Sequence, residues 1–161
     1  MNDDNFIKRD RMRFIKNSQS ANLCYLAILF NVFYFVSIYK SDVGTYYYNI
    51  LIGISIVYNL IFMLAVFLSS ESVKNYDKKY SYVLAVVGAL QIARIFIIPM
   101  RAHNAKIMVN NAEVLVMHSG QFMRVCIYLI ISAVCLLAAA AINYKKCAEL
   151  SEHMKAIGVQ N

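Results

Sequence analysis

The chain has 161 residues, of which 60% are hydrophobic and 16% are charged, and its formal net charge is +7. Soluble domains have about 25% charged residues and less than about half apolar ones, so an ordinary soluble fold is excluded. The positive charge does not indicate a nucleic-acid-binding protein, because most basic residues flank apolar segments, where they set topology and meet anionic lipid headgroups.

The apolar residues fall in four blocks, each about as long as a helix that crosses a bilayer. We therefore predict an all-α integral membrane protein that forms a single domain over residues 1–161, with no room for a separate soluble domain. The predicted spans are residues 20–39, 45–69, 80–100 and 121–144, the tails are residues 1–19 and 145–161, and an outer hairpin covers residues 104–118.

The N-terminal tail is polar and basic, and it either sets the topology or forms a short amphipathic helix on the membrane surface. In the first span, Asn31 falls on one face with Ser20 and Ala27, which predicts a buried polar contact between helices. In the second span, a polar and small arc contains Asn49, Gly53, Ser55, Ile56 and Asn59, opposite an aliphatic arc that we expect to face lipid.

The third span carries Gly88, Gln91 and Arg94 on one wide face, and Pro99 ends it. A charge at the centre of a span costs roughly 2.5–3.5 kcal/mol on insertion scales, so Arg94 is expected to face protein or water. Arg94 is also near enough to the end of the span for its guanidinium to snorkel to the interface, which is an alternative.

Between the third and fourth spans, two β-branched runs flank a polar turn at residues 110–113 and predict a β-hairpin. A short re-entrant or interfacial helix is the alternative. The residues assigned to the outer hairpin as a contact surface are Ile107, Val109, Asn110, Asn111, Glu113, Val114 and Val116.

The fourth span carries a stripe of Arg124, Tyr128, Ser132, Cys135 and Ala139, and we expect a short surface helix in the tail that follows it. Eleven basic residues lie in the two tails and in the connection at 70–79, against four on the other side of the predicted membrane. This bias predicts that both termini are cytoplasmic and that the hairpin lies outside the cell membrane.

No pattern in the chain indicates catalysis, so we expect neither an enzyme nor a cofactor nor a metal site. The predicted spans contain no Asp or Glu, the three histidines lie outside them, and the four cysteines form no CxxC pair. The cysteines are expected to fill space between helices. Arg94 and Arg124 together suggest a basic pocket for an anionic solute or lipid headgroup, although each could instead be structural.

Each predicted helix carries a polar or small-residue stripe, and together these stripes hold more polar groups than so slim a core readily accommodates. The residues expected to lie between helices or to face a partner are Asn31, Asn49, Asn59, Gln91, Arg94, Arg124, Tyr128 and Ser132. We therefore expect an auxiliary or structural subunit of a larger membrane assembly, such as a multi-subunit transporter. Its partners would be another polytopic membrane protein or a second copy, with anionic lipids at the cytoplasmic face.

Two other functions fit the same residues. One is a small homo-oligomeric transporter or channel that selects an anionic solute with Arg94 and Arg124. The other is a membrane sensor that detects a ligand through the outer hairpin.

Overall fold

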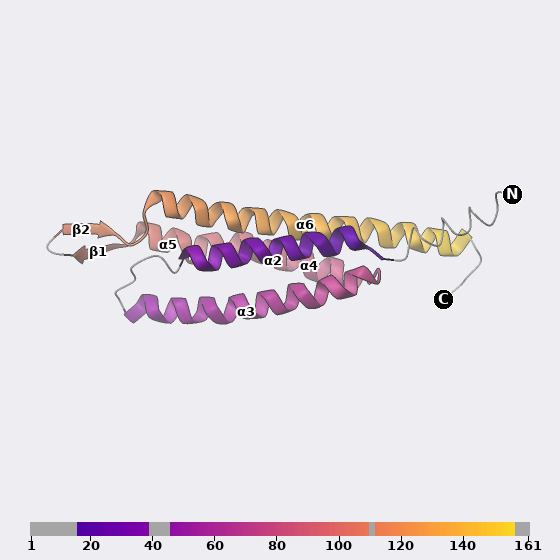
Figure 1. Cartoon of the computed structure of the whole chain (residues 1–161), viewed down its shortest axis with the longest axis horizontal. Helices are drawn as coiled ribbons and strands as arrows, with labels where there is room; N and C mark the ends of the chain where they lie inside the picture. Colours follow the sequence, from indigo (N-terminus) through magenta and orange to yellow (C-terminus); the bar gives the residue numbers. More distant parts are fainter. Residues whose placement is uncertain (1–15, 39–45, 110–111, 157–161) are drawn as a thin grey trace.

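The computed structural model describes residues 16–38, 46–109 and 112–156, and four long helices lie side by side in it (Figure 1). In chain order the elements are α2 (Ser18–Ile38), α3 (Tyr46–Lys74), α4 (Lys79–Ile97), α5 (Pro99–Asn104), β1 (Lys106–Val109), β2 (Ala112–Leu115) and α6 (Ser119–Ala156). Helix α6 packs against α2 and α4, whereas α3 packs against α2 and α4 from the other side. The two strands extend beyond one end of the helices.

Helices α2, α3, α4 and α6 are long and apolar enough to cross a membrane. The 19 residues of α4 span about 28 Å at 1.5 Å per residue, close to the roughly 30 Å of a hydrocarbon core. The prediction of four helices that are long and apolar enough to cross a membrane is therefore confirmed.

Two helices continue past their predicted ends. Helix α3 reaches Lys74 rather than residue 69, and α6 runs without a break to Ala156 rather than ending near residue 144. The separate surface helix expected after residue 144 is thus wrong, because that segment is the last part of α6. Neither extension contains Gly or Pro, and residues such as Ala, Leu, Lys and Glu favour continuation of a helix.

Helix α3 ends in a Schellman turn that reverses the chain into α4. The Asp77 amide donates to the Ser72 carbonyl at 3.3 Å, and the Tyr76 amide donates to the Val73 carbonyl at 3.1 Å. Tyr76 occupies the left-handed position of this motif with φ of 60°, where Gly is the usual residue. Burial raises the pKa of the Tyr76 phenol above its usual value.

Helix α4 ends at Ile97 instead of residue 100, and Pro99 opens the short helix α5, which the sequence did not predict. Pro lacks an amide hydrogen, so it stops α4 but fits the first position of a new helix. After α5, strands β1 and β2 pair antiparallel, with Met108 opposite Glu113. Ala112 and Glu113, predicted in the turn, lie in β2, whereas Val116 follows the strand.

Most of the buried residues of every long helix recur at intervals of three or four, the spacing of a left-handed coiled-coil seam. These seam residues are Ser20, Cys24, Ala27, Asn31 and Tyr34 in α2; Ser55, Asn59, Phe62, Val66, Ser69 and Val73 in α3; Ser81, Leu84, Gly88, Gln91 and Arg94 in α4; and Val125, Leu129, Ser132, Leu136, Ala139 and Asn143 in α6. Gly53, expected on the polar arc of α3, lies exposed outside this seam.

Candidate functional site

A layer of polar side chains crosses the middle of the bundle and joins all four long helices. We call it the central polar layer; its members are Asn31, Ser55, Asn59, Gln91, Arg94 and Ser132, and each is at least 96% buried. Its residues occupy the seam positions of their helices, so the same side chains that would be costly in lipid are turned toward one another.

Arg94 links α4 to α2 and α3. Its Nη1 donates to Asn59 Oδ1 at 2.8 Å and to Asn31 Oδ1 at 3.3 Å, and its Nη2 donates to Ser55 Oγ at 2.9 Å. The guanidinium carbon also lies 4.3 Å from the ring centre of Tyr34 and 4.6 Å from that of Tyr58. A cation held between aromatic faces and neutral oxygens is sheltered from lipid. The alternative prediction, that Arg94 snorkels to the interface, is wrong.

Asn31 is the centre of the hydrogen bonds in this layer. Its Nδ2 donates to Asn59 Oδ1 at 3.1 Å, and its Oδ1 accepts from Gln91 Nε2 at 3.1 Å as well as from Arg94. Gln91 Nε2 also lies 3.4 Å from Ser132 Oγ, which donates to the Ala27 carbonyl at 2.9 Å. Among the side chains that the structure describes, Asn59 Nδ2 and Gln91 Oε1 have no hydrogen-bond partner. The layer therefore uses most of its polar atoms for contacts between helices.

A second polar layer lies toward the other end of the seam and was not predicted. We call it the end polar layer; it consists of Asn17, Ser20, Ser81 and Asn143. Asn143 Oδ1 accepts from Asn17 Nδ2 at 3.0 Å, and Asn143 Nδ2 donates to Ser81 Oγ at 2.8 Å and to the Asp77 carbonyl at 3.0 Å. Two signals were available in the sequence: Asn17 precedes a helix as N-caps do, and Asn143 continues the seam of α6.

An apolar band separates the two polar layers. Its core members include Cys24, Ala27, Val66, Leu84, Cys135 and Leu136. Gly88 brings α4 close to α6 beside this band, since a Cβ atom built on it would lie 3.1 Å from Leu137 side-chain atoms. Alternating polar and apolar layers favour one axial alignment of the helices, because a shift would place amides against hydrocarbon.

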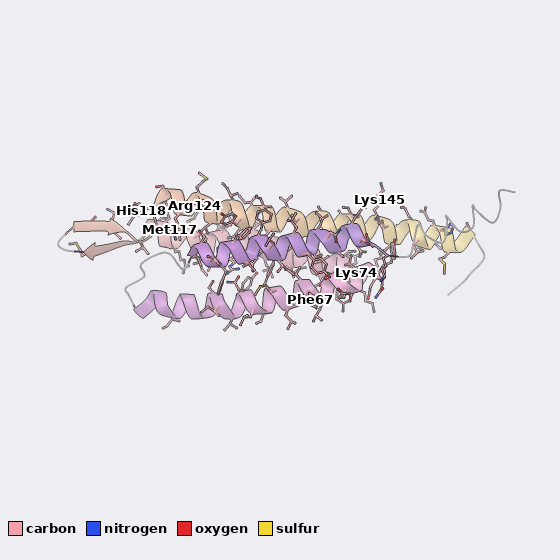
Figure 2. The ribbon with its side chains drawn as sticks, viewed as in Figure 1. Phe67, Lys74, Met117, His118, Arg124 and Lys145 are labelled. Carbon is pink, nitrogen blue, oxygen red and sulfur yellow. The ribbon has the colours of Figure 1, made fainter. Side chains whose placement is uncertain are left out.

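Arg124 is separate from Arg94 and shares none of the contacts given above. It lies exposed near the start of α6, at the end of the bundle opposite Lys145 (Figure 2). Its Nε donates to the Gly120 carbonyl at 3.2 Å. It borders an open groove of about 400 Å³ between α2 and α6, which also includes Tyr128. The structure therefore does not unite the two arginines in one pocket, and of the predicted stripe on α6 only Ser132, Cys135 and Ala139 are buried.

The hairpin strands carry the other predicted contact residues. Lys106 and Glu113, on opposite strands, form an ion pair at 2.8 Å. Asn110 and Asn111 lie outside the described residues, as do the side chains of Asn49, Ile107, Val109 and Val114. Val116 is buried, and its amide donates to the Ala105 carbonyl at 3.0 Å.

The described residues contain no cluster of three His, Cys, Asp or Glu side chains able to hold a metal ion. The central polar layer offers one buried positive charge, amides and hydroxyls. This inventory suits hydrogen bonding and electrostatic attraction rather than proton transfer between acids and bases.

Comparison with known protein families, characterised proteins and solved structures finds no match to this chain.

Proposed function

We propose that this protein is an auxiliary subunit of a larger membrane assembly and that it contacts its partner through the β1–β2 hairpin. The supporting observation is the exposure of this hairpin, which extends beyond the helix ends (Figure 1) and leaves the Met108 side chain 76% exposed. A solitary two-stranded hairpin is only marginally stable in water. A partner strand added at its edge would supply main-chain hydrogen bonds and cover the apolar side chains.

The hairpin presents a mixed surface suited to such a contact. Because directly opposed residues share a face, Met108 and Glu113 lie on the same side as Lys106 and Leu115. Leu115 is 40% exposed, and the Lys106–Glu113 ion pair borders the two apolar side chains. The ion pair runs diagonally between the two apolar side chains, so the face offers a partner both apolar and charged contacts.

The polar layers also support an auxiliary subunit, because they stabilise the bundle rather than contact a partner. The sequence predicts that the excess polar groups face a partner, whereas Asn31, Asn59, Gln91 and Arg94 are buried against one another. The bundle is thus a stable support, and the partner is expected at the hairpin rather than at the polar seams. A multi-subunit transporter remains our proposal for the assembly.

We also propose that the protein lies in the cell membrane with both termini cytoplasmic and the hairpin outside. The basis is the distribution of basic residues, eleven on one side and four on the other. Single cysteines at residue 155 and at Asn104, in a chain cleared of its native cysteines, test this orientation. A membrane-impermeant maleimide should label only the second in intact cells, and labelling of residue 155 alone would contradict the proposal.

The function is tested by purifying the tagged full-length protein at native abundance and quantifying co-purified membrane proteins by mass spectrometry. Met108→Asp should reduce recovery of a specific partner at least tenfold, because it places a charge in the proposed contact. Asn104→Asp, an exposed position at the same end but outside the hairpin, is the matched control and should leave recovery unchanged. Equal recovery with both variants would refute the hairpin contact.

A carrier for an anionic solute is the second candidate, favoured by the positive charge of Arg94, which is buried between the helices. In that case purified protein in liposomes should show flux that Arg94→Met abolishes and Met108→Asp preserves. A sensor that detects a ligand through the hairpin would also lose its response with Met108→Asp, but no membrane protein would co-purify with the wild type.

A further inference from the structure

The groove between α2 and α6 changes character along its length. At its mouth are Ser37, the second-last residue of α2, Gln121, the third residue of α6, and Arg124. Deeper in the bundle the lining is Val32, Phe33 and Tyr128. Tyr128 lies about 13 Å along α6 from Ser119, at 1.5 Å per residue. The groove therefore passes from headgroup depth into the hydrocarbon region.

The inner wall of the groove is aromatic. The Tyr128 ring centre lies 5.9 Å from that of Phe33 and 6.3 Å from that of Phe30. Phe30 and Phe33 meet edge to face at 6.0 Å. Packed rings keep a fixed apolar surface, and the volume of about 400 Å³ falls within the usual range of roughly 300–1,000 Å³ for ligand pockets.

Arg124 gives the mouth of the groove a positive charge and hydrogen-bond donors that can bind a ligand. Only its Nε is used, in the bond to the Gly120 carbonyl, and within the described part of the chain its two Nη groups make no hydrogen bond. The fixed fork of a guanidinium matches the oxygens of a phosphate. Gln121 Nε2 donates to the Ser37 carbonyl at 2.8 Å, which ties α2 to α6 beside this charge.

We propose that this groove binds an anionic glycerophospholipid, with the phosphate at Arg124 and one acyl chain along Val32, Phe33 and Tyr128. The match has two parts: the charge is complementary to the headgroup, and the polar-to-apolar gradient follows that of a lipid along the membrane normal. This inference concerns lipid selection and does not require the auxiliary-subunit function.

The test uses fluorescence, because the chain contains no Trp and Val36→Trp at the edge of the groove would be its only one. The full-length protein is placed in vesicles containing brominated phosphatidylglycerol or brominated phosphatidylcholine, whose bromines quench nearby tryptophan. Quenching gives an association constant for each lipid at the tryptophan. The constant for phosphatidylglycerol should be about five times that for phosphatidylcholine, as expected for one basic residue near an anionic lipid. Adding Arg124→Gln should bring the ratio to about one, whereas Arg124→Lys should largely preserve it.

Ile97→Trp is the matched control, since Ile97 is 52% exposed, Val36 is 54% exposed, and both lie among the last three residues of a helix. The ratio of association constants measured with Ile97→Trp reports the general attraction of anionic lipid to this end of the bundle. An equal ratio at both positions, or a ratio at Val36→Trp that survives Arg124→Gln, would overturn the proposal. Excess inorganic phosphate competes for the same guanidinium and should lower the ratio at Val36→Trp more than sodium chloride of equal ionic strength does. Equal effects of the two salts would overturn the phosphate contact. Circular dichroism verifies that each variant is folded, and Arg124→Lys together with the phosphate competition decides the question if Arg124→Gln does not fold.

Discussion

Replacing Asn31 with Leu removes three hydrogen bonds from the central polar layer while keeping a side chain of similar size. These are the bond to Asn59 and the two bonds that Asn31 Oδ1 accepts from Gln91 and Arg94. Each former partner keeps another contact: Gln91 Nε2 still reaches Ser132, and Arg94 still donates to Asn59 and to Ser55. Each of these donor nitrogens therefore keeps at least one acceptor.

The expected cost follows from the number of bonds. Hydrogen bonds between membrane helices average about 0.6 kcal/mol, so Asn31→Leu should lower the free energy of unfolding by about 2 kcal/mol. Ser55→Ala is the smaller member of the series, because it removes only the bond from Arg94 Nη2 and should cost about 0.6 kcal/mol. Stability is measured by titration from a mild detergent into dodecyl sulfate, followed by circular dichroism.

The stability of the Asn31→Leu variant distinguishes a structural role of the central polar layer from a ligand-binding role. If Asn31→Leu is as stable as the wild type or more stable, the layer does not hold the helices together. Residues kept for function commonly reduce stability, and a gain on replacement would then favour the carrier proposal over the auxiliary subunit.

Two further stability measurements test the packing and the turn. Gly88→Leu should lower the free energy of unfolding by about 1–3 kcal/mol, because the added side chain overpacks against Leu137. Gly53→Ala, with no atom near the added Cβ, should raise it by up to about 1 kcal/mol through helix propensity. Equal effects at the two glycines would show that α4 and α6 do not pack closely at Gly88. The Tyr76→Gly variant should be more stable than the Tyr76→Ala variant by about 1 kcal/mol. Both substitutions remove the ring, but only Gly relieves the cost of a φ of 60°. Equal stability of the two variants would contradict the Schellman turn.

The sequence determined the four membrane-spanning helices, because backbone groups in lipid must be satisfied within a helix and long apolar runs leave no other structure. It also predicted that Gln91 and Arg94 avoid lipid, since charged and amide side chains are costly there. The seam spacing of three and four was present in each helix, and it includes Asn143, which sequence reasoning overlooked.

The tertiary structure decided which polar groups meet. Arg94 is buried between Tyr34 and Tyr58 rather than extended to the interface, whereas Arg124, on a similar polar stripe, lies outside the seam. Both outcomes depend on the rotation and axial alignment of one helix against its neighbours. No single helix specifies these quantities, because they arise from the simultaneous packing of four seams and the pairing of their polar layers.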